Sequence, residues 1–502
     1  MRRLALAAAI VCAAACGGGA PPRGADVAVV TEGARLRWED PLPAKTAIFD
    51  GERVRLRAAR GEVLGLHALR RAVGGAGPVM LTLAAPGVRV DAFTVDHGRV
   101  AKPSTAMYGG SRGRGRYPDR LTPATQPVAA ERSAFFDISV AWNAAPGTVT
   151  GLLEIDAARI PVELTVVDVE LADITAAPRA WAYYDAKEIM RASGTAPEAL
   201  LAEETRFAAM FRAHGVVASP ELTPDTWNAR RDLVAGLRYV PALLPRGCAD
   251  IAADVQRWVA LTGGSGQTPF AIPIDEPRTI LAQLRVRARA ACVRDGGGGP
   301  DRFLYAVTQK PSWIMGKDVD VHISPFGGDW TYNGTPPWAG AMVLDAAEPG
   351  TRTWGWIGFR HDVPLWYVWD AMYWRDRYNK GRDAAPLHDL VADPLTFDDG
   401  EDHGNLDGVL AYPGALPSLR LKALRRGLHD RALLDALAAC AGRPAAEAIA
   451  AELVPSSLGT AKRGERASWP TNDDAWEAAR ARVLDALLAC RAGGGGAPSG
   501  PP

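Results

Sequence analysis

The sequence predicts a β + α/β chain in which a β-sandwich precedes a TIM-type (β/α)8 barrel with helices at the C-terminal end. Two observations support this fold class. Between residues 35 and 169, short segments of alternating hydrophobicity are broken by Gly and Pro, and no long amphipathic helix intervenes. After Pro178, eight short apolar runs alternate with helical stretches, which is typical of repeated β/α units.

The predicted organisation has six parts. These are a lipoprotein signal peptide at 1–16, a flexible tether at 17–32, a β-sandwich domain at 33–170, a (β/α)8 barrel catalytic domain at 171–415, C-terminal helices at 416–492 and a disordered tail at 493–502.

Alternation and apolar runs predict the individual elements. The sandwich strands are Arg35–Trp38, Val54–Ala58, Val63–His67, Val79–Leu83, Phe135–Trp142, Val149–Ile155 and Val162–Val169. The barrel strands are Trp181–Tyr184, Val216–Ser219, Tyr239–Leu244, Phe270–Ile274, Phe303–Val307, Val319–Ser324, Trp330–Tyr332 and Leu365–Trp369. The helices are Pro197–His214, Thr226–Gly236, Ala249–Leu261, Arg278–Cys292, Thr351–Arg360, Ser418–Cys440 and Asp473–Cys490. A doubly wound sheet is the alternative, but no glycine-rich nucleotide loop follows any of these strands.

Charge and histidine content exclude several classes of function. The 57 basic and 57 acidic residues cancel, so the chain lacks the positive charge expected of a nucleic-acid-binding protein. The eight histidines are scattered and no Cys-x-x-Cys motif occurs, so we expect neither a metal site nor a cofactor. The oligomeric state is not predicted.

The first residues resemble a bacterial lipoprotein signal. Arg2 and Arg3 precede an apolar stretch that is too short to span a bilayer, and Ala13-Ala14-Ala15-Cys16 closes it. We therefore expect export, lipidation at Cys16 and contact with the membrane only through that lipid anchor. Ordinary cleavage after Ala15, giving a secreted or periplasmic protein, is the alternative.

Four cysteines remain after such cleavage, an even number in an oxidising compartment. Because each pair joins helices that are adjacent in the predicted order, we expect the disulfides Cys248–Cys292 and Cys440–Cys490. Buried free thiols are the alternative.

The strongest candidate for chemistry is Asp275-Glu276, at the end of the apolar run Phe270–Ile274. Barrel enzymes place their active sites at the carboxyl edge of the strands. Two adjacent carboxyl groups resist ionising together, and glycoside hydrolysis needs one protonated and one charged carboxyl. The alternative is that the pair caps the helix that follows it.

Aromatic and polar residues cluster near the ends of the last strands. Sugar rings stack on aromatic faces, and their hydroxyls bind Asp and Asn side chains. The residues predicted to bind substrate are Tyr183, Asp185, Trp330, Tyr332, Asn333, Trp369, Asp370 and Tyr373. Trp354, Trp356 and Trp366 are expected in the core instead.

Several motifs in this region resemble the catalytic region of glycoside hydrolase family 123. The motifs are Trp330-Thr-Tyr-Asn-Gly334, Arg352-x-Trp354-x-Trp356, Leu365-Trp-Tyr-Val-Trp-Asp370, Asp407-Gly-Val-Leu-Ala-Tyr-Pro-Gly414, Pro417-Ser-Leu-Arg420 and Arg425-x-Gly427-x-x-Asp430. Upstream, Tyr117-Pro-Asp119 and Pro146-Gly147 resemble the sandwich that precedes such barrels.

This resemblance implies an N-acetylgalactosaminidase-like hydrolase of terminal β-linked 2-acetamido sugars that acts with retention by substrate-assisted catalysis. Glu276 is then the general acid/base, and Asp275 orients the 2-acetamido group, whose carbonyl attacks C1. Strand seven ends in Tyr332-Asn333-Gly334 and supplies no second Glu as a protein nucleophile. The alternatives are a non-catalytic glycan-binding surface lipoprotein and an envelope scaffold whose aromatic residues all lie in the core.

Overall fold

We describe a computed structural model of the chain, which covers residues 26–71, 74–347, 349–377 and 386–493. The predicted signal peptide, Cys16 and the tail from 494 onward lie outside these residues. Within the described ranges, no helix is both long and apolar enough to cross a membrane.

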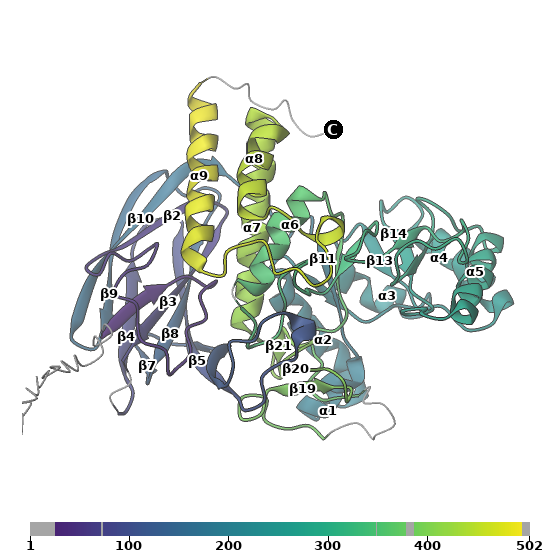
Figure 1. Cartoon of the computed structure of the whole chain (residues 1–502), viewed down its shortest axis with the longest axis horizontal. Helices are drawn as coiled ribbons and strands as arrows, with labels where there is room; N and C mark the ends of the chain where they lie inside the picture. The colour runs from purple at the N-terminus through teal and green to yellow at the C-terminus, as the bar shows by residue number, and fades with distance from the viewer. Residues whose placement is uncertain (1–25, 72–73, 348, 378–385, 494–502) are drawn as a thin grey trace, which may run out of the picture.

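Two five-stranded sheets form the N-terminal part of the chain (Figure 1). The first has the order β1 (Val27–Val30), β3 (Val63–Arg70), β8 (Ser133–Val140), β5 (Val88–Val100) and β6 (Gly115–Ala124). The second has the order β2 (Val54–Arg60), β10 (Ala158–Glu170), β9 (Gly147–Ile155), β4 (Gly77–Leu83) and β7 (Val128–Ala130). Leu66 and Phe136 of the first sheet share one hydrophobic cluster with Leu81 and Leu164 of the second, so both sheets bury an apolar face against the same core.

The structure corrects three predictions in this part. Strand β1 pairs antiparallel with β3 and is largely buried, so residues 27–30 of the predicted tether form an ordered strand. Residues 35–38 form no strand; the side chain of Arg35 donates hydrogen bonds to the carbonyls of Val343 and Leu344, at 3.3 and 3.4 Å. Strands β5, β6 and β7 were not predicted.

Eight short strands follow in two four-stranded parallel sheets, in the segments that the apolar runs predict. One sheet has the order β12 (Val217–Ser219), β11 (Ala180–Tyr183), β18 (Trp366–Val368) and β17 (Thr331–Tyr332). The other has the order β13 (Tyr239–Pro241), β14 (Thr268–Ala271), β15 (Leu304–Val307) and β16 (Val321–His322). The helices between these strands are α1 (Ala186–Ser193), α2 (Leu200–Arg212), α3 (Trp227–Arg230), α4 (Cys248–Thr262), α5 (Ile280–Asp295) and α6 (Thr353–Arg360). The chain therefore combines a β-rich part with an α/β part, as predicted.

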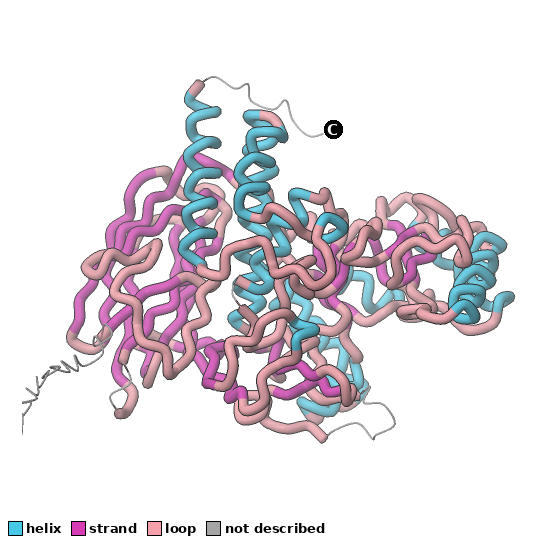
Figure 2. Tube along the Cα trace, in the orientation of Figure 1, coloured by secondary structure: helices cyan, strands magenta, loops and turns pink. Residues whose placement is uncertain are grey.

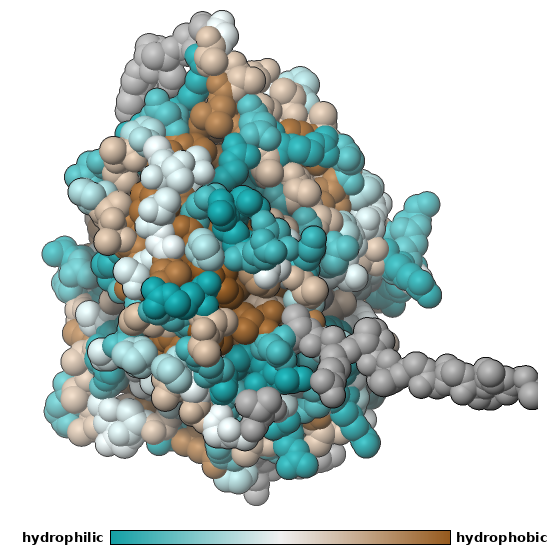
Figure 3. Space-filling model, turned by 90° about the vertical axis from the view of Figure 1, so that its left-hand side faces the viewer, coloured by the Kyte–Doolittle hydropathy of each residue, from teal (hydrophilic) through white to brown (hydrophobic). Residues whose placement is uncertain are grey.

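Two small hairpins and three helices complete the chain (Figure 2). The hairpins are β19 (Leu395–Asp398) with β20 (His403–Asn405), and β21 (Ala411–Tyr412) with β22 (Leu416–Pro417). The helices are α7 (Leu419–Ala441), α8 (Arg443–Leu453) and α9 (Asp473–Ala492). Helices α7 and α9 stand between the N-terminal sheets and the parallel strands (Figure 1). On the side of the molecule formed by the two N-terminal sheets, hydrophobic residues lie in separate areas among hydrophilic ones (Figure 3).

Both predicted disulfides are confirmed. Cys248–Cys292 joins α4 to α5, with Cα atoms 5.3 Å apart. Cys440–Cys490 joins α7 to α9, with Cα atoms 6.3 Å apart. The two bridges close loops of 44 and 50 residues, and such cross-links stabilise a fold mainly by restricting the unfolded chain.

Helix α7 carries buried cations along the face that meets the N-terminal sheets. Arg420 forms two hydrogen bonds of 2.9 and 2.8 Å with the carboxylate of Asp119 on β6. Lys422 and Arg425 both contact Asp137 on β8, at 2.6 and 2.5 Å. Burial raises the pKa of Asp137, but the charges of Arg425 and Lys422 outweigh this effect and hold the pKa below its usual range.

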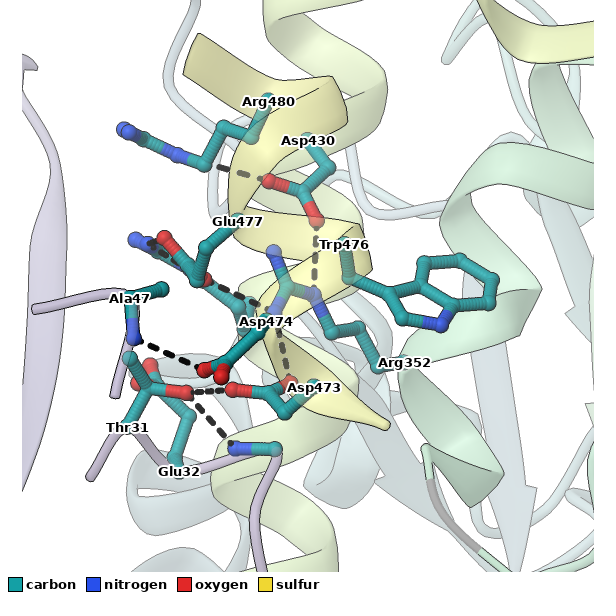
Figure 4. A network of polar contacts seen from close by, with 12 residues as sticks. Thr31, Glu32, Ala47, Arg352, Asp430, Asp473, Asp474, Trp476, Glu477 and Arg480 are labelled. Atoms are coloured by element: carbon teal, nitrogen blue, oxygen red, sulfur yellow. Dashed lines mark hydrogen bonds and ion pairs between the residues drawn. The ribbon is translucent and has the colours of Figure 1, made fainter. Parts of the chain in front are cut away.

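Another buried cation, Arg352, links α7 to α9 (Figure 4). Its guanidinium contacts the carboxylates of Asp430, Asp473 and Glu477 at 3.0, 2.9 and 2.7 Å. The indole of Trp356 donates a 2.9 Å hydrogen bond to Asp430. As expected, Trp356 is part of the core, and so are Trp354 and Trp366.

We expect Asp119→Ala to destabilise the protein by about 3–5 kcal/mol, because it leaves the guanidinium of Arg420 buried without its carboxylate. Chemical denaturation measures this difference. The matched control is Asp26→Ala, which removes an exposed ion pair with Arg71 and should cost at most about 1 kcal/mol. Equal losses for the two variants would contradict the role given to Asp119.

Candidate active site

Asp275 and Glu276 lie on a loop beyond the carboxyl end of β14. The strand ends at Ala271, three residues earlier than predicted, and residues 272–279 form an irregular connection to α5. Glu276 has a backbone φ of +39°, in the left-handed region that residues with a Cβ seldom adopt. Such conformations persist only where neighbouring groups hold them, and they concentrate at functional sites.

The hydroxyl of Thr308 holds both members of the pair. Thr308 directly follows β15, the neighbour of β14 in the sheet. Its oxygen accepts a 2.7 Å hydrogen bond from the backbone N–H of Glu276, and its proton is donated to Oδ1 of Asp275. Sequence analysis did not predict this residue, because a single polar side chain after the buried run Leu304–Val307 is too common to stand out.

The carboxyl group of Glu276 has two partners. The phenol of Tyr332 on β17 donates a 3.0 Å hydrogen bond to Oε1, and the exposed Arg278 forms an ion pair with Oε2. The side chain of Glu276 is 37% exposed, so the group is open to solvent while one oxygen is fixed in direction. The structure thus brings the predicted residue Tyr332 to the carboxyl pair.

Three half-buried tyrosines lie on neighbouring strands beside this pair: Tyr183, Tyr332 and Tyr367. Tyr332 is directly opposite Tyr367 in the sheet, and their ring centroids are 6.3 Å apart. Tyr367 stacks on Trp181 at 4.9 Å, and Trp181 meets Phe270 edge to face at 5.4 Å. The tyrosines therefore cover a buried aromatic layer and present a partly exposed aromatic floor. Sequence analysis missed Tyr367.

Carboxyl groups from three strand ends gather around Tyr367. Burial raises the pKa of its phenol well above the usual value, and the charges of Asp275, Glu221 and Asp370 act in the same direction. Glu221 follows β12, and burial together with the charge of Asp275 raises its pKa to about 7.

Asp275 also has an altered pKa. Part of the residue is exposed, but the protein around its carboxyl displaces water, and this desolvation raises the pKa. The hydrogen bond from Thr308 opposes the shift, while the charge of Glu276 adds to it. Among the described residues, no group of three or more His, Cys, Asp or Glu side chains could hold a metal ion.

The prediction that Trp330 and Tyr373 bind substrate is wrong, because both aromatic rings are buried. Trp330 is 4% exposed and packs against Tyr239 and Phe270, with ring centroids 4.6 and 5.0 Å away. Tyr373 is fully buried, and its hydroxyl donates a 2.7 Å hydrogen bond to Asp376. Neither ring has a face free for a sugar.

The remaining predicted residues lie around the end of β18. Asp370 is buried and paired with Arg377, so its carboxylate does not face solvent as a sugar ligand would, which corrects its predicted role. Burial raises the pKa of Asp370 to about 7 despite the charge of Arg377. Asp185 caps α1 by accepting a 3.0 Å hydrogen bond from the N–H of Lys187.

Trp369 is half-buried and fixed on several sides. Its backbone N–H donates to the side chain of Asn333 at 3.1 Å, and its indole N–H points at Asp407 at 3.4 Å. Tyr108, from the short helix Ala106–Tyr108 between β5 and β6, donates a 2.7 Å hydrogen bond to the same Asp407. The N-terminal part thus helps to orient Trp369, and Asn333 supports the backbone.

The comparisons with known proteins give a likeness in fold. A family 123 glycoside hydrolase from Clostridium perfringens, solved in a study of glycolipid glycan hydrolysis, matches 93% of this chain and 98% of its own, with a TM-score of 0.50 and 10% identity. A glycosyl hydrolase family 2 member from Bacteroides cellulosilyticus covers 62% of this chain and 44% of its own, at 9% identity and a TM-score of 0.24, too low to support an argument. No family model and no curated protein matches the sequence.

We expect Thr308→Val to raise the pKa of Asp275 further, because it removes the hydrogen bond that favours the ionised carboxyl. A pH titration followed by the ¹³C signal of the Asp275 carboxyl measures the change. The control is Thr205→Val, whose hydroxyl bonds only to the Leu201 carbonyl within α2. An unchanged or lowered pKa in Thr308→Val would contradict the arrangement described above.

Proposed function

We propose that this protein is a glycoside hydrolase that removes terminal β-linked 2-acetamido sugars with retention of configuration, by substrate-assisted catalysis. The observation that carries the proposal is the Asp275-Glu276 pair, which lies at the carboxyl edge of the parallel strands beside the floor of Tyr183, Tyr332 and Tyr367. An apolar floor with adjacent carboxyl groups suits a sugar ring, which has apolar C–H faces and a polar periphery.

In this proposal Glu276 is the general acid and base. Its carboxyl is accessible, and the hydrogen bond from Tyr332 orients one oxygen. The protonated carboxyl gives its proton to the glycosidic oxygen as the bond to C1 breaks. In the second step the carboxylate removes a proton from the water that attacks C1, which restores the protonated acid.

Asp275 acts on the substrate rather than on the leaving group. Its carboxylate accepts a hydrogen bond from the N–H of the 2-acetamido group, while Thr308 holds it in place. The acetamido carbonyl oxygen attacks C1 and forms a cyclic oxazolinium intermediate. Water then opens this intermediate, so two inversions at C1 give net retention.

Neither Asp370 nor Glu221, the carboxyl groups near Asp275, is suited to act as a protein nucleophile, which favours substrate assistance. A double-displacement enzyme needs an ionised second carboxylate about 5 Å from the acid. Asp370 is buried against Arg377, and burial together with the charge of Asp275 raises the pKa of Glu221 to about 7, which favours the protonated form of this carboxyl over the ionised form that a nucleophile needs. The likeness in fold to an enzyme solved in a study of glycolipid glycan hydrolysis supports a glycan as the substrate.

The finer architecture is also part of the proposal. Parallel bridges between Leu222 and Ala242 and between Ile323 and Trp330 link the two four-stranded sheets at both ends, which supports a closed (β/α)8 barrel. The shared core of the five-stranded sheets supports a β-sandwich. We keep the domain limits predicted from the sequence as part of this proposal, with the sandwich starting at β1, and we propose that the protein is exported and lipid-anchored at Cys16.

We expect Glu276→Gln to lower kcat/KM by roughly 10²–10⁴-fold on 2-acetamido glycosides with poor leaving groups, because it removes general acid catalysis. The loss should be far smaller for dinitrophenyl glycosides, whose leaving group needs no proton. Asp275→Asn should slow both substrates, because participation of the acetamido group precedes departure of either leaving group. Glu52→Gln, on an exposed turn of the N-terminal part, is the matched control and should match the wild type.

A panel of aryl glycosides with and without the 2-acetamido group tests the mechanism. Equal cleavage of both kinds by the wild type would refute substrate assistance. If no glycoside is cleaved but glycans still bind, the protein is a glycan-binding lipoprotein instead.

A further inference from the structure

A groove of about 620 Å³ opens between the end of β13, the end of β14 and the outer face of α5. Its lining is predominantly apolar, and the residues that form its walls include Ala242, Leu243, Leu244, Ile272, Ile274 and Ala288. Its volume lies in the range of ligand pockets, which are apolar and carry a few polar groups that fix the orientation of the ligand.

The groove lies beside the candidate active site. Ile274 lines it and directly precedes Asp275 in the chain. Glu221 also lines it, and the charge of Asp275 acts on this carboxyl. The tyrosine floor lies on β11, β17 and β18, whereas the groove lies along β13 and β14. Glu221 and Ile274 are the lining residues through which the groove approaches the Asp275-Glu276 pair.

Two cations face the groove without a carboxylate partner. Arg246 and Arg285 both line it, and neither forms an ion pair with a carboxylate among the residues that the structure describes. A third cation, Arg289, is occupied by a 2.9 Å hydrogen bond to the carbonyl of Pro273. The free arginines offer planar donors that suit a phosphate or a carboxylate.

The apolar lining continues onto the open surface. Ile280 and Leu281, in the first turn of α5, are 67% and 60% exposed, and Leu284 is 47% exposed. Leu243, beyond β13, is 48% exposed. Leu243 is itself part of the groove lining, whereas the other three side chains lie on α5, the helix that supplies Arg285 and Ala288 to that lining. Exposed apolar side chains on the elements that form a groove commonly mark a binding surface.

We propose that this groove binds an aliphatic amphiphile, with the alkyl chain along Leu244, Ile272 and Ala288 and an anionic head group on Arg246 and Arg285. The assignment of this groove to a part of the substrate rests on the proposed function. The groove then receives the leaving-group side of the substrate, so that the substrate class is a glycoside with an anionic, lipid-like aglycone, and the sugar lies over the tyrosines.

Isothermal titration calorimetry of the full chain with hexyl, octyl and decyl phosphate, each below its critical micelle concentration, tests the proposal. Each added methylene should tighten binding by about three- to fourfold, the value expected for a buried CH₂. Decyl phosphate should bind at least tenfold more tightly than decyltrimethylammonium, which has the same chain and the opposite charge. Affinity that does not depend on chain length, or binding only above the micelle concentration, would overturn the proposal.

Two sets of variants locate the site. Ala288→Glu places a longer, negative side chain in the groove at an exposed helix position and should weaken decyl phosphate binding at least tenfold. Its control, Ala253→Glu on the exposed face of α4, should have no effect. The double variant R246Q/R285Q should abolish the preference for phosphate over ammonium, and Arg231→Gln, an exposed cation outside the groove, should preserve it. An unchanged affinity in Ala288→Glu would exclude this groove.

The probes contain no glycosidic bond, so the binding result does not depend on the proposed activity. If the calorimetry succeeds and no glycoside is cleaved, the amphiphile site stands and the hydrolase proposal fails. If 2-acetamido glycosides are cleaved but their KM does not fall as the alkyl aglycone lengthens, the site is not the leaving-group subsite.

Discussion

The buried charge pairs along α7 are the constraint on which the rest of the structure depends. The helix offers Arg420, Lys422 and Arg425 to carboxylates of the N-terminal sheets, and each pair is nearly inaccessible to water. Buried ion pairs add little net stability compared with apolar contacts, but a displaced helix would leave several charges buried and unpaired. The pairs therefore fix the position of α7 relative to the sheets, which hydrophobic contact alone would specify less sharply.

This constraint extends toward the candidate site through the loops that precede α7. Arg420 also donates hydrogen bonds to the carbonyls of Met342 and Leu406, at 2.7 and 3.0 Å, so the cation that binds Asp119 also holds the chain beside Asp407. Asp407 in turn accepts hydrogen bonds from Tyr108 and Trp369. The motifs around Asp407 and Arg420 that resemble the glycoside hydrolase family thus lie in the scaffold that supports the candidate site.

The sequence revealed those parts of the site that leave a local pattern. An apolar run that ends in two carboxyl groups identified Asp275 and Glu276, and a tyrosine at the end of a short strand identified Tyr332. Thr308 left no such pattern, because a single threonine after a buried strand is common and its hydrogen bonds depend on the neighbouring strand. The prediction for Trp330 failed for a related reason. Trp330 precedes Tyr332 by two residues and therefore points to the same face, but it lies one layer deeper in the core. Polar neighbours in the sequence do not reveal that depth.

The environment of Asp275 explains how the two adjacent carboxyl groups can differ in role. Desolvation favours the protonated form of Asp275, whereas the hydroxyl of Thr308 favours the ionised form. A sugar bound over the tyrosines would remove more water and shift this balance toward the protonated form. An acetamido N–H donated to Asp275 would compensate, because it supplies a second hydrogen bond to the ionised carboxyl at the moment when water leaves. A sugar without that group would instead leave Asp275 desolvated and short of a donor, so in the proposed mechanism the geometry that orients the acetamido group would also select for it.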